Sequence, residues 1–125
     1  MIEIVLPFPP STNTYYRHLS GGSAAGRSLI SAAGRKYRQA IQEQALVQRW
    51  KRFKPEERLA VEIDAWMPDR RRRDLDNMLK STLDSLTHAG LWSDDSQIDS
   101  LKIVRIPTLG GMLKIRVKAL EATCS

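Results

Sequence analysis

The residues best suited to chemistry in this chain stand together between Pro68 and Lys80. Four consecutive arginines, Arg70, Arg71, Arg72 and Arg73, precede the carboxylates of Asp74 and Asp76. A block of guanidinium groups is costly to remove from water and attracts phosphate strongly. Carboxylate oxygens are the ligands that Mg2+ prefers. Phosphate-binding cations beside metal-binding acids indicate a nuclease centre.

The same aspartates also have a structural alternative. Leu75, Leu79, Leu83 and Leu86 recur at spacings of four and three, which predicts a helix beginning at Asp74 to Asp76. Aspartate is a favoured N-cap residue, and an acid in the first turn complements the helix dipole. Because that end of the dipole repels cations, a metal site there needs two or more carboxylates. Spacing alone leaves both roles open.

Lys80 is predicted to share one helical face with Asp76 and Asp84, since the three lie four residues apart. It could reach the first-turn carboxylate and form an ordinary surface ion pair. It could also be a fixed positive charge that stabilises a phosphodiester in its transition state.

A second acidic pair, Asp94 and Asp95, follows Gly90, where the helix is expected to end. Turn chemistry explains such a pair, and further metal ligation is the functional alternative. Trp92 is expected to anchor the core rather than stack on a base.

The composition favours an anionic partner. A chain of 125 residues is expected to form one domain, residues 1–125, and its net charge of +6 favours nucleic acid first and a membrane surface second. No apolar run approaches the roughly 20 residues of a membrane span, and no signal-peptide pattern opens the chain. The single cysteine, Cys124, excludes an intramolecular disulfide. We therefore expect a soluble, cytoplasmic protein.

The apolar pattern predicts four strands and two main helices. Strands are expected from Ile2 to Leu6 and from Leu59 to Met67, each ended by proline. Two more, from Ile98 to Ile106 and from Met112 to Leu120, are expected to form a hairpin. The helices are expected from a Ser31 cap to about Arg49, with Ala33, Tyr37, Ile41 and Ala45 inward, and from Asp76 to Ala89.

This order, β-α-β-α-β-β, predicts an α+β fold in which a two-layer mixed β-sheet is packed with two main helices. In the last strand Leu113, Ile115 and Val117 should point inward, and Lys114, Arg116 and Lys118 should form a basic outer face.

The segment from Ser11 to His18 is polar and aromatic, and Gly21, Gly22 and Gly26 follow it, which predicts a long loop. Nucleic acid is one expected partner of this loop, through hydrogen bonds and base stacking. The contacting residues would be Asn13, Tyr15, Tyr16 and Arg17. Tyrosines packed on the rim of the core, with Asn13 in a turn, are the structural alternative.

Three motifs together resemble the RusA family of Holliday junction resolvases over nearly the whole chain. The first is Pro9-Pro10-Ser11-Thr12-Asn13 followed by Tyr15-Tyr16-Arg17. The second is Met67-Pro68-Asp69 running into Arg73-Asp74-Leu75-Asp76-Asn77 with Lys80. The third is Gly90-Leu91-Trp92-Ser93-Asp94-Asp95.

The resemblance implies a homodimer that binds four-way DNA junctions in recombination and repair and makes two symmetric Mg2+-dependent nicks. It implies metal binding by Asp74, Asp76 and Asp95, with Lys80 as an essential basic residue and Arg73 in a supporting role. A non-catalytic basic nucleic-acid-binding module remains an alternative, as does a Mg2+ nuclease acting on another branched DNA or on RNA.

The predicted helix raises a question about how the three aspartates meet. A helix from Asp76 to Ala89 is about 20 Å long, so Asp95 lies near its far end unless the chain doubles back. A return within one subunit is just possible, because six extended residues span about that distance. In the alternative, paired antiparallel helices of a dimer bring Asp95 of one subunit to Asp74 and Asp76 of the other.

Overall fold

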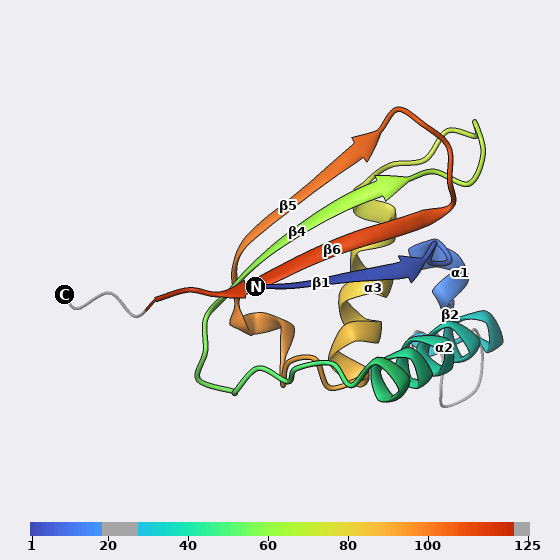
Figure 1. Ribbon diagram of the computed structural model, residues 1–125. Helices are drawn as coiled ribbons and strands as arrows, with labels where there is room; N and C mark the ends of the chain where they lie inside the picture. The colour runs from blue at the N-terminus through green and yellow to red at the C-terminus, as the bar shows by residue number, and fades with distance from the viewer. Residues whose placement is uncertain (19–27, 122–125) are drawn as a thin grey trace.

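The computed structural model describes residues 1–18 and 28–121, and its main feature is a four-stranded sheet in the order β1-β6-β4-β5 (Figure 1). β4 (Leu59–Trp66) is antiparallel to β6 (Met112–Ala119) and parallel to β5 (Ile98–Ile106). β1 (Ile2–Pro7) pairs antiparallel with β6 at one edge. The mixed sheet and two main helices confirm the predicted α+β class.

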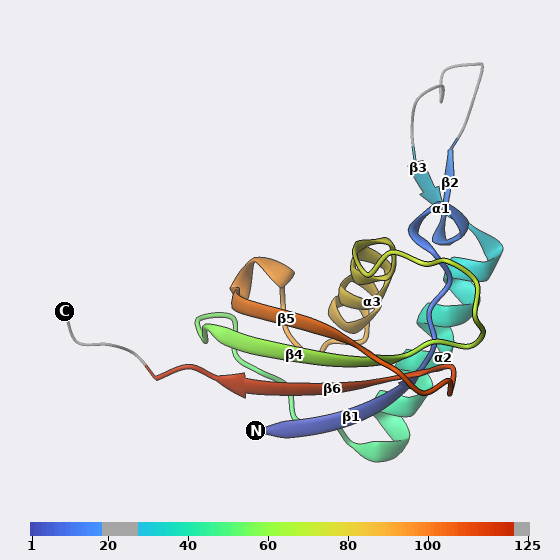
Figure 2. The same cartoon turned by 90° about the horizontal axis from the view of Figure 1, so that it is seen from above.

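The main helices are α2 (Ala32–Gln48) and α3 (Asp76–His88). α3 crosses one face of the sheet, and the strands show their other face uncovered toward the viewer in Figure 1 (see also Figure 2). The side chains on the helix side are buried as predicted, and they are Leu59, Val61, Ile63, Ala65, Leu113, Ile115 and Val117. No helix among the described residues is long and apolar enough to cross a membrane.

α2 also protects the β1 edge of the sheet. The Tyr37 hydroxyl donates a hydrogen bond to the Pro7 carbonyl at 2.7 Å, and the Gln44 amide donates to the Val5 carbonyl at 2.6 Å. These side chains occupy carbonyl groups that an edge strand otherwise offers to another chain. The opposite edge, β5, carries the exposed apolar residues Leu101 and Val104.

The predicted hairpin between β5 and β6 is wrong, because β4 lies between these strands and pairs with both. Residues 107–111 instead pass across the end of β4, where the N–H groups of Gly110 and Gly111 donate to the Met67 carbonyl at 2.9 and 3.1 Å. A Cβ on Gly110 would stand 3.0 Å from the Trp66 Cβ, and Gly111 has a φ of 68°. Two glycines therefore permit the close crossing.

The prediction of an irregular loop after Pro10 is also wrong for the described part. Residues 12–18 form α1 (Thr12–Tyr15) and β2 (Tyr16–His18), and β2 pairs with β3 (Ser28–Ile30). Ser11 caps α1 by accepting a hydrogen bond from the Thr14 N–H at 3.2 Å. One helical turn is too short to produce an apolar period. The predicted glycine loop at Gly21, Gly22 and Gly26 lies outside the described residues.

α2 begins after its predicted N-cap, Ser31, whose hydroxyl accepts a hydrogen bond from the Gly34 N–H at 3.0 Å. Tyr37, Ile41 and Ala45 are buried as predicted, but Ala33 is exposed and Gly34 takes the fourth inner position. The Tyr15 backbone lies against Gly34, which leaves no room for a side chain. Close contact between α2 and the end of α1 thus replaces the expected alanine packing.

Replacing Gly34 by Ala should destabilise the protein, although alanine is the better helix former by about 1 kcal/mol. Its Cβ would stand 2.4 Å from the Tyr15 carbonyl oxygen and 2.8 Å from the Ile30 Cγ2. Overpacking of this kind costs about 1–3 kcal/mol. Urea unfolding of Gly34→Ala beside the wild type measures the difference. A stability gain would contradict the contact.

α3 buries a different face from the one its leucines predict. Met78, Ser81, Thr82, Ser85 and Leu86 are buried, whereas Leu75, Leu79 and Leu83 are only half-buried. The buried hydroxyls have hydrogen-bond partners, since Ser81 donates to the Pro10 carbonyl at 3.0 Å and Thr82 to the Met78 carbonyl at 2.7 Å. Polar side chains are buried here because the segment before α1 packs on them. The helix ends as predicted at Gly90, which has a φ of 85°.

Candidate active site

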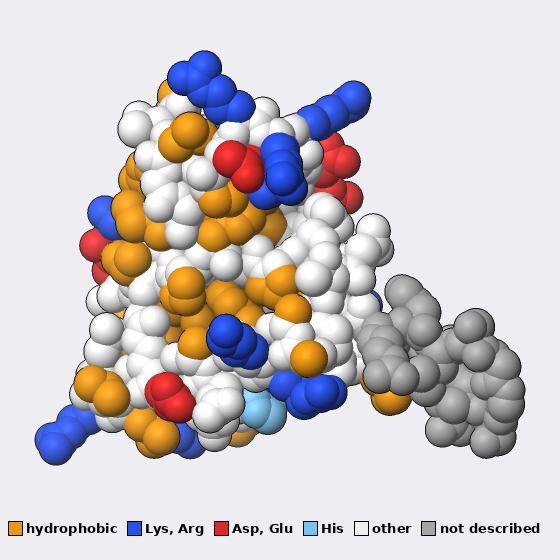
Figure 3. All heavy atoms as spheres, turned by 90° about the vertical axis from the view of Figure 1, so that its right-hand side faces the viewer, with side chains coloured by type: hydrophobic (Ala, Val, Ile, Leu, Met, Phe, Trp, Pro, Cys, Tyr) orange, Lys and Arg blue, Asp and Glu red, His pale blue; other side chains and the backbone are white. Residues whose placement is uncertain are grey.

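Asp69 organises the arginine block, which lies in the segment between β4 and α3. This segment is at the right-hand end of Figure 1, the end that faces the viewer in Figure 3. Its carboxylate accepts a hydrogen bond from the Arg71 N–H at 2.9 Å and forms an ion pair with Arg73. Hydrogen bonds from Arg73 and from the Arg71 backbone lower the pKa of Asp69 to about 2. The Arg73 guanidinium carbon also lies over the Phe8 ring, 5.7 Å from the ring centroid. The Arg73 backbone carbonyl accepts a hydrogen bond from the Arg105 guanidinium. Arg73 is therefore fixed in place.

The other three arginines, Arg70, Arg71 and Arg72, are exposed. Within the described part of the chain only Arg71 has an acidic neighbour, Asp69, with Nε 3.9 Å from the carboxylate. Arginines exposed in this way are available to phosphate.

Asp74 and Asp76 are exposed where α3 begins, and neither side chain caps the helix. Leu75 holds the N-cap position with helical backbone angles and no side-chain hydrogen bond. The capping alternative is therefore not realised. Among the described residues neither carboxylate has an ion-pair partner, so both keep their oxygens for another ligand.

Lys80 does not form the alternative surface ion pair with Asp76 or Asp84 in the described structure. Its Nζ lies over the Tyr16 ring, 4.9 Å from the centroid. Tyr16 is half-buried and packs edge-on against Tyr15, with ring centroids 4.8 Å apart. A cation held by an aromatic face stays available to a negatively charged ligand.

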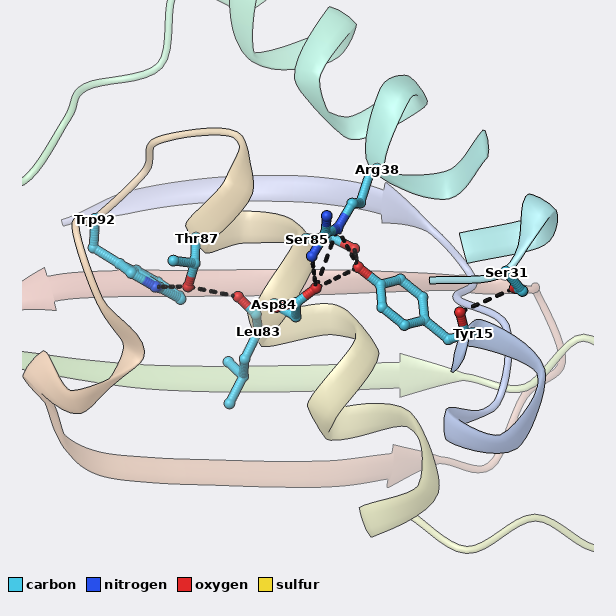
Figure 4. Close-up of polar contacts among 8 residues, drawn as sticks. All are labelled: Tyr15, Ser31, Arg38, Leu83, Asp84, Ser85, Thr87 and Trp92. Atoms are coloured by element: carbon cyan, nitrogen blue, oxygen red, sulfur yellow. Dashed lines mark hydrogen bonds and ion pairs between the residues drawn. The ribbon is translucent and has the colours of Figure 1, made fainter. Parts of the chain in front are cut away.

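Asp84 is engaged by α1 and α2 (Figure 4). Its Oδ2 accepts hydrogen bonds from the Tyr15 hydroxyl and from Arg38 Nη2, each at 2.5 Å. Arg38 Nε also donates to the Tyr15 oxygen at 2.7 Å. Burial and the hydrogen bond with Asp84 raise the pKa of Tyr15 to about 12. Tyr15 is fully buried, which favours the structural alternative, a tyrosine packed on the core, over contact with nucleic acid.

The other residues predicted to contact nucleic acid, and Trp92, differ in how exposed they are. Asn13 is exposed and Tyr16 is half-buried, so both keep surface for a ligand. The Arg17 side chain lies outside the described residues. Trp92 is a core anchor, as predicted, and its indole N–H donates to the Thr87 hydroxyl at 2.6 Å (Figure 4).

Asp94 and Asp95 have different surroundings. Asp94 is the N-cap of a short 3-10 helix, η2 (Asp95–Gln97), and its carboxylate accepts a hydrogen bond from the Ser96 N–H at 2.9 Å. Hydrogen bonds from Ser96 lower the pKa of Asp94. Partial loss of water, a hydrogen bond with Asp94, and the charges of Asp94 and Asp84 raise the pKa of Asp95. Asp94 thus has the turn role, and Asp95 remains the predicted metal ligand of the pair.

The three predicted metal ligands do not form one cluster in a single subunit. No group of three or more Asp, Glu, His or Cys side chains in residues 1–18 and 28–121 could hold a metal ion. Asp74 and Asp76 stand at the start of α3, whereas Asp95 begins η2, which follows α3 in the chain and packs against it, near enough to Asp84 for the charge of Asp84 to act on Asp95. Their exposed carboxylates nevertheless suit Mg2+, which takes oxygen ligands and retains several waters.

The basic outer face of the sheet is largely neutralised. Arg116 pairs with Glu62 at 3.1 Å and Asp64 at 2.8 Å, and Lys114 Nζ lies 3.8 Å from Glu3. The arginine block therefore offers stronger attraction for phosphate than this face does.

Sequence reasoning missed the roles of Phe8, Arg38 and Arg105, which come from three separate parts of the chain. Phe8 and Arg105 support Arg73, and Arg38 neutralises Asp84. Only the fold brings these partners together, so local spacing carries no signal for them.

Comparison with known proteins shows similarity to one family over nearly the whole chain. The family profile described as Endodeoxyribonuclease RusA matches residues 7–118. A protein of Enterobacteria phage HK97 named crossover junction endodeoxyribonuclease rusA is 42% identical over 121 residues, which cover 96% of each chain. A protein of Escherichia coli K12 with the same enzyme name is 40% identical over 119 residues, covering 92% of each. These findings confirm the family and enzyme class expected from the motifs: the chain belongs to the RusA family of endodeoxyribonucleases.

Proposed function

We propose that this protein resolves four-way DNA junctions by paired, symmetric, Mg2+-dependent nicks, during recombination and repair in the cytoplasm of a bacterium or a phage-infected cell. The observation that carries the proposal is the pair of exposed carboxylates, Asp74 and Asp76, which have no capping role and follow the arginine block directly. The named relatives are crossover junction endodeoxyribonucleases, which supports the same substrate.

The residues have distinct proposed roles. Asp74, Asp76 and Asp95 would hold Mg2+, which when bound supplies an activated water and polarises the scissile phosphate. Lys80 and the fixed Arg73 stabilise negative charge on the phosphodiester. Arg70, Arg71 and Arg72, with Asn13, Tyr16 and Arg17, bind the DNA around the nick. Cleavage leaves a 5'-phosphate and a 3'-hydroxyl.

Each active site is proposed to take residues from both subunits of a homodimer. Its support is the lack of a three-ligand group in the described residues of one subunit, where Asp74 and Asp76 stand at the start of α3 and Asp95 begins η2. An isologous pairing of antiparallel α3 helices places the end of one helix beside the start of the other. Each dimer then contains two identical sites, one for each nick.

An apolar strip beside α3 fits the second copy. Leu79 and Leu83 are only half-buried, and α3 lies next to β5 in Figure 2. The strand register places Leu101 and Ile103 beside Val61 and Ile63, on the face that α3 crosses, yet Leu101 is 42% exposed. Apolar surface of this kind, next to an unprotected edge strand, is typical of a protein interface.

The test uses a labelled synthetic four-way junction, with linear duplex, a flap and single-stranded RNA of matched sequence beside it. With Mg2+ we expect paired nicks in the junction and none in the duplex, and with EDTA no nicks. Cleavage of the flap or RNA in preference to the junction would indicate a nuclease with another substrate. Binding without cleavage in any divalent metal would indicate a non-catalytic module.

A further inference from the structure

A pocket of about 370 Å³ lies between the segment around α1 and the start of α3. This volume is within the range of roughly 300–1,000 Å³ of small-ligand sites. Its lining combines an apolar wall with polar groups from two separate segments. The residues are Phe8, Pro9, Pro10, Ser11, Thr14, Arg71, Arg72, Arg73, Asp74, Asn77 and Met78.

Both walls of the pocket are held to α3 or to each other. On one side, Thr12 donates to the Asn77 carbonyl at 2.8 Å, and the Pro10 carbonyl accepts from Ser81 at 3.0 Å. On the other side, Arg73 is held by Asp69 and lies over Phe8. The cavity is therefore formed before any ligand enters, which favours tight binding.

The polar groups of the pocket suit a phosphate and a base edge. Arg71 and Arg72 are exposed, and within the described residues Arg72 has no ion pair or side-chain hydrogen bond. The Asn77 side chain likewise makes no hydrogen bond there, so its amide can both donate and accept. Phe8 and Pro10 are half-buried and offer a surface against which a planar base can stack, with the buried Pro9 and Met78 behind it.

We propose that this pocket binds one unpaired nucleotide at the branch point of the junction, with its base against the Phe8–Pro10 wall and its phosphate on Arg71 and Arg72. The proposal rests on the proposed function, since it assigns a subsite for the same DNA. A base inside a duplex cannot enter the cavity, so the nucleotide leaves the stack. Leaving is least costly where pairing is already interrupted, as at a branch point. Asp74 lines the same pocket, so the captured nucleotide places a neighbouring phosphodiester beside this proposed metal ligand.

The test places 2-aminopurine, whose fluorescence rises when it unstacks, at each branch-point position in turn in a four-way junction. Wild-type protein is added in EDTA, so that binding occurs without cleavage. We expect a fluorescence change of severalfold at both members of one symmetric pair of positions and little change at the others. Arg72→Ala and the pocket-filling Thr14→Phe should abolish this change at DNA-saturating protein concentrations.

Two matched variants separate the pocket from general effects. Arg70→Ala removes the same charge outside the pocket, so it should weaken binding like Arg72→Ala but keep the fluorescence change at saturation. Val47→Phe adds the same ring on α2, where Val47 is 82% exposed, and should keep the change as well. Junction binding and cleavage without any fluorescence change, or a change that survives both pocket variants, would overturn the subsite alone. Failure of the wild type to bind junctions would overturn the proposed function and the subsite with it.

Discussion

Replacing Asp76 by Asn is expected to abolish cleavage of a four-way junction while junction binding persists or tightens. Asparagine keeps the shape of the side chain but removes the negative charge that would hold Mg2+, and it also removes repulsion of the DNA phosphates. Loss of a single transition-state hydrogen-bond donor costs about 10²–10³ in rate, and loss of a metal ligand should cost at least that. Single-turnover cleavage and gel-shift titration measure the two effects separately.

The fold should survive this substitution, because the Asp76 side chain makes no capping hydrogen bond. Removing its charge from the first turn of α3 costs only about 0.3–1 kcal/mol. Asp94→Asn is the matched control, since asparagine caps as well as aspartate does and Asp94 has the turn role. It should leave cleavage within a few-fold of wild type. Full activity of Asp76→Asn would mean that this acid is structural.

The second large effect is expected at the α3–β5 surface. Leu83→Glu and Leu101→Glu should each give a monomer that cannot cleave junctions, because a charge would be buried at the proposed dimer interface. Truncation or disruption of a central interface residue commonly costs about 2 kcal/mol or more of binding free energy. Sedimentation equilibrium reports the oligomeric state, and junction cleavage reports the activity.

Val47→Glu is the control for this surface, since Val47 is apolar, 82% exposed and located on α2. It should leave both dimerisation and cleavage unchanged. Thermal unfolding of all three variants checks that the monomers are folded. If Leu83→Glu and Leu101→Glu remain dimeric and active, the two copies meet on another surface.

The sequence predicts the elements of this fold better than their connections. Apolar and polar residues alternate along β4 and β6, which indicates directly that one face of the sheet is buried. The burial of Leu59, Val61, Leu113 and Ile115 was therefore predicted correctly. The pairing of β5 depends on β4, which comes about 40 residues earlier, and no local turn signal encodes it. The hairpin prediction failed for that reason.

The positions of the candidate site residues could be predicted where they depend on the spacing of a short motif. They could not be predicted where they depend on packing between distant parts of the chain. The spacing of Asp74 and Asp76 places them at the start of α3, but only the structure gives the cap position to Leu75. Lys80 has acidic neighbours one turn away on each side, and its observed partner, Tyr16, lies 64 positions earlier in the chain. Likewise, Tyr15 and Asp84 meet across 69 positions, so the burial of Tyr15 could not be read from its neighbours.

A shared active site is tested most directly by mixing two inactive variants, Asp76→Asn and Asp95→Asn, through co-expression. If each site takes Asp74 and Asp76 from one subunit and Asp95 from the other, a mixed dimer has one doubly substituted site and one intact site. Random pairing makes half of the dimers mixed, so about a quarter of the wild-type sites and a clear single-strand nicking activity should return. If each site instead lies within one subunit, every site in the mixture carries a substitution, and persistent inactivity of confirmed mixed dimers would contradict the shared site.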